Sequence, residues 1–129
     1  MSRRHAWALA ACLALPAASL AAGDVVGDVA AGRKAFAACA SCHQAGPSAR
    51  HAFGPQLNAL AGRKAGTQPG YAYSKALAAS GLVWRADTLA AYLRDPNALL
   101  PGTKMRFWGL GIGEREAADL LAYLATTDR

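Results

Sequence analysis

Hydrophobic residues recur at helical spacing near both ends of the chain, and no stretch keeps the alternation of a β-strand. Near the start, Asp28 can cap a helix that runs to about Ala38, with Val29, Gly32 and Phe36 at helical spacing. A glycine inside a helix costs about 1 kcal/mol relative to alanine. We therefore expect another helix to approach Gly32 closely.

The partner of this helix is expected at the other end of the chain. Glu114 and Glu116 sit favourably in the first turn of a predicted helix, where negative charge complements the helix dipole. Its apolar stripe consists of Leu120, Leu121 and Leu124. We expect the two terminal helices to cross.

The segment between them is mostly loop. Residues 44–70 are rich in glycine, proline and polar residues, and a short helix follows from Ser74 to about Ala79. A firmer helix opens at Asp87 or Thr88 and stops before Pro96. After a brief turn, residues 103–109 are expected to be extended. The pattern predicts one all-α domain without internal repeats.

Residues 1–22 are predicted to be a signal peptide, which leaves residues 23–129 as the domain. A short basic start precedes an apolar run over 6–15, and small residues then lead to a cleavage site after Ala21, or a residue or two later. The alternative is a membrane anchor that is not cleaved. The sequence does not favour it, because the apolar run is shorter than the roughly 20 residues that a membrane-spanning helix needs and Pro16 interrupts it. Cys12 could also be the lipid-attachment cysteine of a lipoprotein signal. The pattern does not favour this alternative, because too short an apolar segment precedes Cys12.

The size and the net charge of the chain limit which functions it can have. The chain has 129 residues, and the part after the signal peptide is rather small for a self-sufficient apolar core, so a bound group is expected to help it fold. Without Arg3 and Arg4, 12 basic and 8 acidic residues remain, a formal charge of +4. This balance favours an acidic protein surface over nucleic acid as a partner, since no arginine-rich run is present.

The most informative motif for function is Cys39-Ala-Ser-Cys42-His43. Two thiols three residues apart lie on one face of a helical turn, where each can add to one vinyl group of the same porphyrin, and His43 then lies under the iron. Thiol–disulfide exchange would need a strand–helix–strand setting, and zinc would need further ligands. The five-residue pattern favours covalently attached haem.

A second axial ligand is expected from Met105, the only methionine besides the initiator. Proline and glycine at 101–102 precede it, and a thioether ligand raises the reduction potential, which suits an electron carrier. His51 is a competing ligand, although it is more simply a solvated side chain in a polar loop. Lys104 could replace Met105 at high pH if that loop opened.

Together these residues resemble class I cytochromes c of the mitochondrial and bacterial c2 kind. The matching stretches, in order, are 27–29 with Gly32 and Phe36, 39–43, 54–55, 62–63, 70–74, Trp84, 92–93, Pro96, 101–105 with Phe107, and 122–124. The resemblance implies a cytochrome c fold, in which crossed terminal helices, short helices and loops wrap around one haem c. That haem is bound through Cys39 and Cys42, with His43 and Met105 on its iron.

The resemblance also implies further contacts with the haem. The carbonyl of Pro55 should accept a hydrogen bond from the ring of His43 and orient it. The propionates should be surrounded by Arg63, Tyr73, Trp84 and Thr103. Tyr92 should lie near the Met105 sulfur, and Phe107 should close the front of the crevice. Simple core packing is the alternative role for these aromatic residues.

Two departures from the resembled family stand out. Leu77 occupies a position where mitochondrial relatives carry an asparagine that helps to hold an internal water near the haem. The ring of lysines at the haem edge is thin, because Lys104 matches but Asn97 and Ala98 stand where charge is usual. A different basic patch is possible, made of Arg33, Lys34, Arg94 and Arg106.

The sequence therefore predicts a periplasmic carrier, not an enzyme, that moves one electron at a time between redox proteins such as an oxidase, a reductase or a dehydrogenase. We expect a monomer that inserts in no membrane after cleavage. Two alternatives stay open. One is a dedicated electron-accepting subunit of a single dehydrogenase, and the other is a ligand-binding or peroxidatic haem protein with a labile bond to Met105.

Overall fold

The helices and loops of this chain lie around an internal cavity. The structure, a computed structural model, describes residues 25–109 and 111–127, so the signal peptide predicted for 1–22 lies outside the described residues. Its helices are α1 (Val29–Phe36), α2 (Lys75–Ala78), α3 (Ala86–Arg94), α4 (Pro96–Leu99) and α5 (Glu114–Ala125). Strand pairing in this part of the chain is limited to one isolated antiparallel bridge between Lys64 and Val83. The all-α prediction is confirmed.

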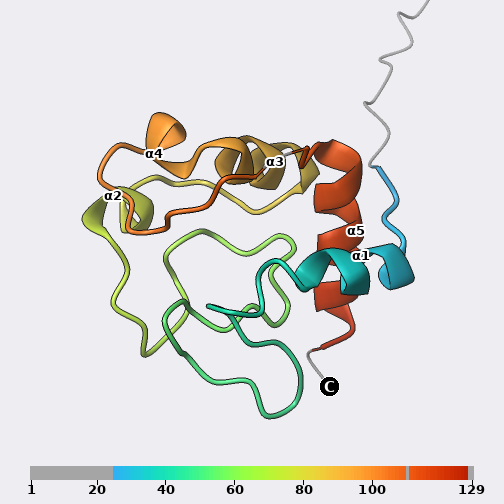
Figure 1. Cartoon of the computed structure of the whole chain (residues 1–129). Coiled ribbons are helices and arrows are strands. Elements are labelled where there is room, and N and C mark those ends of the chain that lie inside the picture. The colour runs from blue at the N-terminus through green and yellow to red at the C-terminus, as the bar shows by residue number, and fades with distance from the viewer. Residues whose placement is uncertain (1–24, 110, 128–129) are drawn as a thin grey trace, which may run out of the picture.

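Helix α1 lies across α5, as expected, and this contact joins the two ends of the domain (Figure 1). A Cβ on Gly32 would overlap with the carbonyl oxygen of Asp119, and one on Gly27 would overlap with that of Ala118. The backbone N–H of Asp28 donates to Oδ1 of Asp119 at 2.7 Å. The predicted close approach at Gly32 is thus a backbone-to-backbone contact that a larger residue cannot keep.

The boundaries of α1 differ from the prediction at its C-terminal end. The helix ends at Phe36 rather than Ala38, because the next residues tighten into turns in which the N–H of Cys39 donates to the carbonyl of Phe36 at 2.8 Å. Val29 is 45% exposed, whereas the ring of Phe36 packs 5.6 Å from that of Tyr123 on α5. Only part of the expected face is therefore buried.

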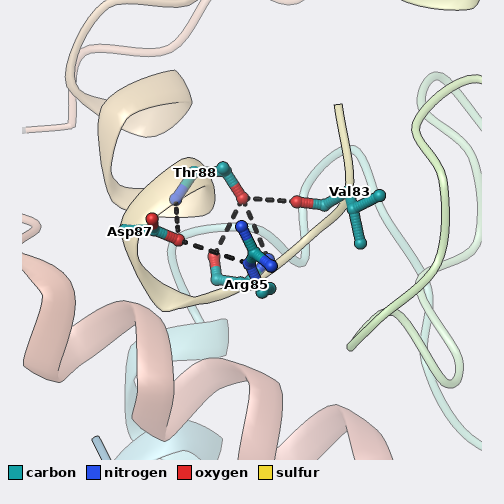
Figure 2. A network of polar contacts seen from close by, with 4 residues as sticks. All are labelled: Val83, Arg85, Asp87 and Thr88. Carbon is teal, nitrogen blue, oxygen red and sulfur yellow. Dashed lines mark hydrogen bonds and ion pairs between the residues drawn. The ribbon is translucent and has the colours of Figure 1, made fainter. Parts of the chain in front are cut away.

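Helix α3 begins earlier than Asp87 or Thr88, with Arg85 as its N-cap (Figure 2). The hydroxyl of Thr88 accepts a hydrogen bond from the Arg85 N–H at 2.9 Å and donates to the Val83 carbonyl at 2.6 Å. Asp87 accepts from the N–H of Thr88 at 2.8 Å. Thr88, the third residue of the helix, thus accepts the N–H of the N-cap residue Arg85, as the side chain at this position does in a capping box.

The remaining predicted elements are close to those observed. Ser74 caps α2 by accepting from the N–H of Leu77, and residues 103–109 contain no helix. Helix α3 packs against α5. The buried hydrophobic cluster includes Leu60, Trp84, Leu89, Tyr92, Leu93, Leu120, Leu121 and Leu124. None of the helices described is long and apolar enough to span a bilayer.

The variant Gly32→Ala tests the helix crossing by the sign of its effect. Helix propensity alone would raise the free energy of unfolding by about 1 kcal/mol, but the overlap with Asp119 should instead lower it by about 1–3 kcal/mol. Denaturant unfolding of the haem-loaded protein measures the difference. Ala30→Gly on the exposed face of α1 calibrates propensity in the same helix, and a stabilising Gly32→Ala would contradict the contact.

Candidate functional site

A cavity of about 500 Å³ lies at the centre of the fold, within the size range of small-molecule and cofactor sites. Leucines from α3, α5 and the loops line much of its wall, among them Leu57, Leu89, Leu93 and Leu120. The residues predicted to contact the haem also line it, namely Cys39, Cys42, His43, Pro55, Arg63, Tyr73, Trp84, Tyr92, Thr103, Met105 and Phe107. The cavity is thus mostly apolar, with a few convergent polar groups.

The two thiols are brought to the cavity wall by a single tight turn. The N–H of Cys42 donates to the carbonyl of Cys39 at 3.1 Å, and the N–H of His43 donates to the same carbonyl at 2.9 Å. Burial raises the pKa of the Cys39 thiol, and the neighbouring Cys42 adds to the shift. One turn therefore presents two sulfurs and an imidazole to the same space.

The ring of His43 is fixed on both of its sides. Its Nδ1 lies 2.7 Å from the carbonyl oxygen of Pro55, so Nδ1 carries the proton and donates, which leaves Nε2 with a lone pair for a metal. A Cβ on Gly54 would overlap with the ring at Cε1. Burial lowers the pKa of His43, and the Pro55 hydrogen bond opposes that shift only in part. The imidazole is therefore held neutral, as a metal ligand must be.

The segment that carries Met105 is tied down just before that residue. The hydroxyls of Tyr92 and Thr103 are buried and lie 2.7 Å apart in a direct hydrogen bond. Lys104 donates through Nζ to the carbonyl of Ala72 at 2.9 Å, which joins this segment to the loop before α2. Met105 itself is half-buried at the cavity wall.

The same segment is also pinned after Met105. A Cβ on Gly109 would overlap with the carbonyl oxygen of Leu93, so the backbone lies directly against the end of α3. This role of Gly109 was not predicted, because a lone glycine in a predicted extended segment does not reveal a tertiary contact. Contacts with other parts of the chain thus occur both before Met105, at Thr103 and Lys104, and after it, at Gly109.

The polar corner of the cavity is built around Arg63. Its Nη1 donates to the carbonyl of Asn58 at 2.8 Å, and Asn58 in turn exchanges two hydrogen bonds of 2.8 Å with the backbone of Gly46. Burial raises the pKa of Tyr73, while the charge of Arg63 acts to lower it. The guanidinium and the phenol thus lie near each other at the cavity wall. The supporting role of Asn58 was missed from the sequence.

The aromatic residues on the α3 side pack as a pair. The rings of Trp84 and Tyr92 lie 5.2 Å apart in an edge-to-face arrangement, and both residues are buried. Leu77 also lines the cavity and packs against the buried cluster. The Tyr92 hydroxyl is hydrogen-bonded directly to the hydroxyl of Thr103.

His51 does not line the cavity, and its side chain is half-buried rather than fully solvated. Its Nε2 donates to the carbonyl of Pro69 at 2.8 Å, while Nδ1 accepts from the N–H of Gln56 at 3.2 Å. His51 is therefore a brace between two loops on the wall of the site. Histidine in a polar loop gives no sequence signal for this role.

The sequence of this chain is similar to those of known proteins. The family model for cytochrome c matches residues 29–128. This chain belongs to the cytochrome c family. Cytochrome c2 of Rhodomicrobium vannielii is 46% identical over 116 residues, which are 90% of this chain and 89% of that protein. Cytochrome c-550 of Nitrobacter winogradskyi is 45% identical over 80% of this chain and 94% of that protein.

A solved structure supports the same conclusion. Cytochrome cH from Methylobacterium extorquens has a TM-score of 0.67 and 44% sequence identity, over 78% of this chain and 99% of that one. The resemblance to c2-like class I cytochromes c is confirmed, and with it a single covalently bound haem c and its iron. Cys39 and Cys42 fit the attachment motif, and the apolar cavity with its neutral histidine fits the group. No cluster of ligands for a zinc ion occurs among the described residues.

Gly54→Ala tests how closely the backbone supports His43 in this cytochrome. The added methyl group cannot share space with the ring, so the free energy of unfolding of the haem protein should fall by about 1–3 kcal/mol. Thermal or denaturant unfolding measures this. The control is Ala52→Ser, an exposed change two residues away. Equal stability of Gly54→Ala and wild type would contradict the close contact.

His51→Ala separates a loop brace from an iron ligand. Loss of both ring hydrogen bonds should lower the free energy of unfolding by about 1–3 kcal/mol and leave the visible haem spectrum unchanged. Arg50→Ala is the neighbouring control, an exposed position where a change of at most about 0.5 kcal/mol is expected. A spectrum altered by His51→Ala at neutral pH would assign this histidine to the iron.

Proposed function

We propose that this cytochrome is a diffusible one-electron carrier of the periplasm, with His43 and Met105 as the axial ligands of its iron. The observation that carries the proposal is the restraint on both groups at one cavity. His43 is fixed by the Pro55 carbonyl and by Gly54. The Met105 segment is fixed at Thr103 and at Lys104.

This restraint favours a carrier over a ligand-binding or peroxidatic haem protein. Such a protein needs an open or easily opened position on the iron, whereas a carrier needs both axial positions filled in both oxidation states. Ties on either side of Met105 oppose its displacement. Because Lys104 is bonded to Ala72, replacement of the thioether by this lysine also requires that bond to break.

The haem supplies the one-electron chemistry of its iron, and the protein sets the conditions. His43 offers a neutral nitrogen whose basicity is raised by donation to Pro55. The thioether of Met105 stabilises the reduced state and so raises the potential. The leucine-lined wall excludes water from around the iron. Because these groups are fixed, little rearrangement should accompany the gain or loss of an electron.

The polar corner is suited to the haem propionates. Arg63 carries a permanent positive charge, and its bond to the Asn58 carbonyl holds it at the cavity wall. Tyr73 lies beside it as a hydrogen-bond donor, and its raised pKa keeps the phenol protonated. Trp84 and Thr103 complete the proposed surroundings of the propionates. The ring of Phe107 is proposed to close the front of the crevice.

The proposed location is the periplasm, reached by export with residues 1–22 as the signal peptide. An oxidising compartment would otherwise convert a lone cysteine pair to a disulfide, and attachment of haem uses both thiols. The partners are then other redox proteins outside the cytoplasmic membrane, and the protein acts as a monomer without an enzymatic activity of its own. Signal-peptide processing should leave the mature chain starting at residue 22, 23 or 24.

Met105→Ala tests the axial ligand. Loss of the thioether should abolish the weak red absorption band of methionine-bound ferric haem and lower the reduction potential by on the order of 0.1 V. A redox titration followed by absorption spectra measures both. Leu57→Ala, which shortens another side chain of the cavity wall that is not a proposed ligand, should leave the red band in place. Unchanged spectra and potential in Met105→Ala would exclude the proposed ligation.

A further inference from the structure

Two large aromatic side chains are left almost fully exposed beside the cavity. Phe53 is 85% exposed and Trp108 is 84% exposed, although the other tryptophan described, Trp84, is buried. Phe53 contributes to the cavity wall, and Trp108 directly follows Phe107, which does so as well. Phe53 thus borders the cavity and Trp108 is next in sequence to a residue that borders it, and neither ring is among the proposed ligands of the iron.

Each ring is carried by a backbone that is held in place. The hydroxyl of Tyr71 donates to the carbonyl of Phe53 at 2.8 Å, and the N–H of the adjoining Gly54 donates to the carbonyl of Cys42 at 2.8 Å. Trp108 precedes Gly109, whose Cα lies against the carbonyl of Leu93. Aromatic rings on rigid supports lose little entropy on binding, which makes them effective anchors.

The charged side chains that line the cavity all have one sign. No aspartate or glutamate occurs in residues 29–86 or in residues 96–113, the two segments that contain Phe53 and Trp108. The charged side chains at the cavity wall are Arg63, Lys64, Lys104 and Arg106. All eight acidic residues lie elsewhere in the chain. A second copy of this chain would bring like charges together, whereas an acidic surface would be attracted.

We propose that Phe53 and Trp108 are the docking anchors for the electron-transfer partner, a redox protein with an apolar patch rimmed by carboxylates. This inference rests on the proposed carrier function and adds how the partner is recognised. The basic residues steer the approach and make the association rate depend on salt. The two rings hold the complex once formed, so they take over part of the role that a fuller lysine ring would have.

The test uses respiratory membranes of Bradyrhizobium diazoefficiens, the source of a cytochrome c-550 that is 43% identical to this chain. The chemically reduced holoprotein is mixed with these membranes in air, and its oxidation is followed at several protein and salt concentrations. Trp108→Ser should lower the second-order rate constant about tenfold. Phe53→Ser should lower it in the same direction, and the slope of the rate against salt should be kept in both variants.

The matched control is Val26→Ser, an apolar residue 82% exposed before α1 and outside the cavity wall. It should oxidise at the wild-type rate. Trp108→Ser should also keep the wild-type potential and the wild-type rate with ferricyanide, a small oxidant that needs no protein docking surface. Arg106→Gln should weaken the salt dependence, which separates steering from anchoring.

The experiment separates failure of the docking anchors from failure of the carrier function. If Trp108→Ser and Val26→Ser are both oxidised at the wild-type rate, the anchors are wrong while the carrier function stands. If membranes cannot oxidise the wild-type protein at all, the carrier function and the anchors both fail. Binding to phosphatidylglycerol vesicles that is lost in Trp108→Ser would overturn the proposal in favour of a lipid surface, and dimerisation lost in Trp108→Ser would overturn it in favour of self-association.

Discussion

The structure depends on a central space that its own side chains do not fill. Leucines from α3, from α5 and from the loops all face a cavity of about 500 Å³, so the hydrophobic core of this small domain is complete only with a large apolar group inside it. Family membership supplies that group as covalently bound haem c. The short helices and long loops follow from this arrangement, because they pack on the haem as much as on one another. Attachment through Cys39 and Cys42 makes the haem a permanent part of the core.

The backbone provides the precision of the site more than the side chains do. Glycines at 32, 54 and 109 each lie where a Cβ would overlap with another part of the chain. The first closes the contact between α1 and α5 (Figure 1), the second makes room for the ring of His43, and the third sets the segment after Met105 against α3. The hydrogen bonds of His43, Arg63 and Thr103 then orient groups that are proposed to touch the haem or its iron.

The sequence predicted the elements and the lining of the cavity well, because both leave local signals. Helical periodicity identified α1 and α5, and the Cys39–His43 pattern identified the covalently bound haem. Boundaries were less accurate. Helix α3 begins before Asp87 because Thr88 caps it from within, and α1 ends at Phe36 where the chain tightens toward Cys39. His51, Asn58 and Gly109 were missed or misread, since each acts through a partner far along the chain and such contacts have no sequence pattern. The exposed rings of Phe53 and Trp108 could be recognised only once burial was known.

We propose that one iron is held by a fixed nitrogen and a fixed sulfur, with the same ligands before and after it accepts an electron. Iron K-edge X-ray absorption of the purified holoprotein, recorded in both oxidation states, measures this directly. We expect a sulfur scatterer together with nitrogen scatterers in both states, at nearly unchanged distances from the iron. A first shell of nitrogen or oxygen alone at neutral pH, or a sulfur present in only one state, would contradict it.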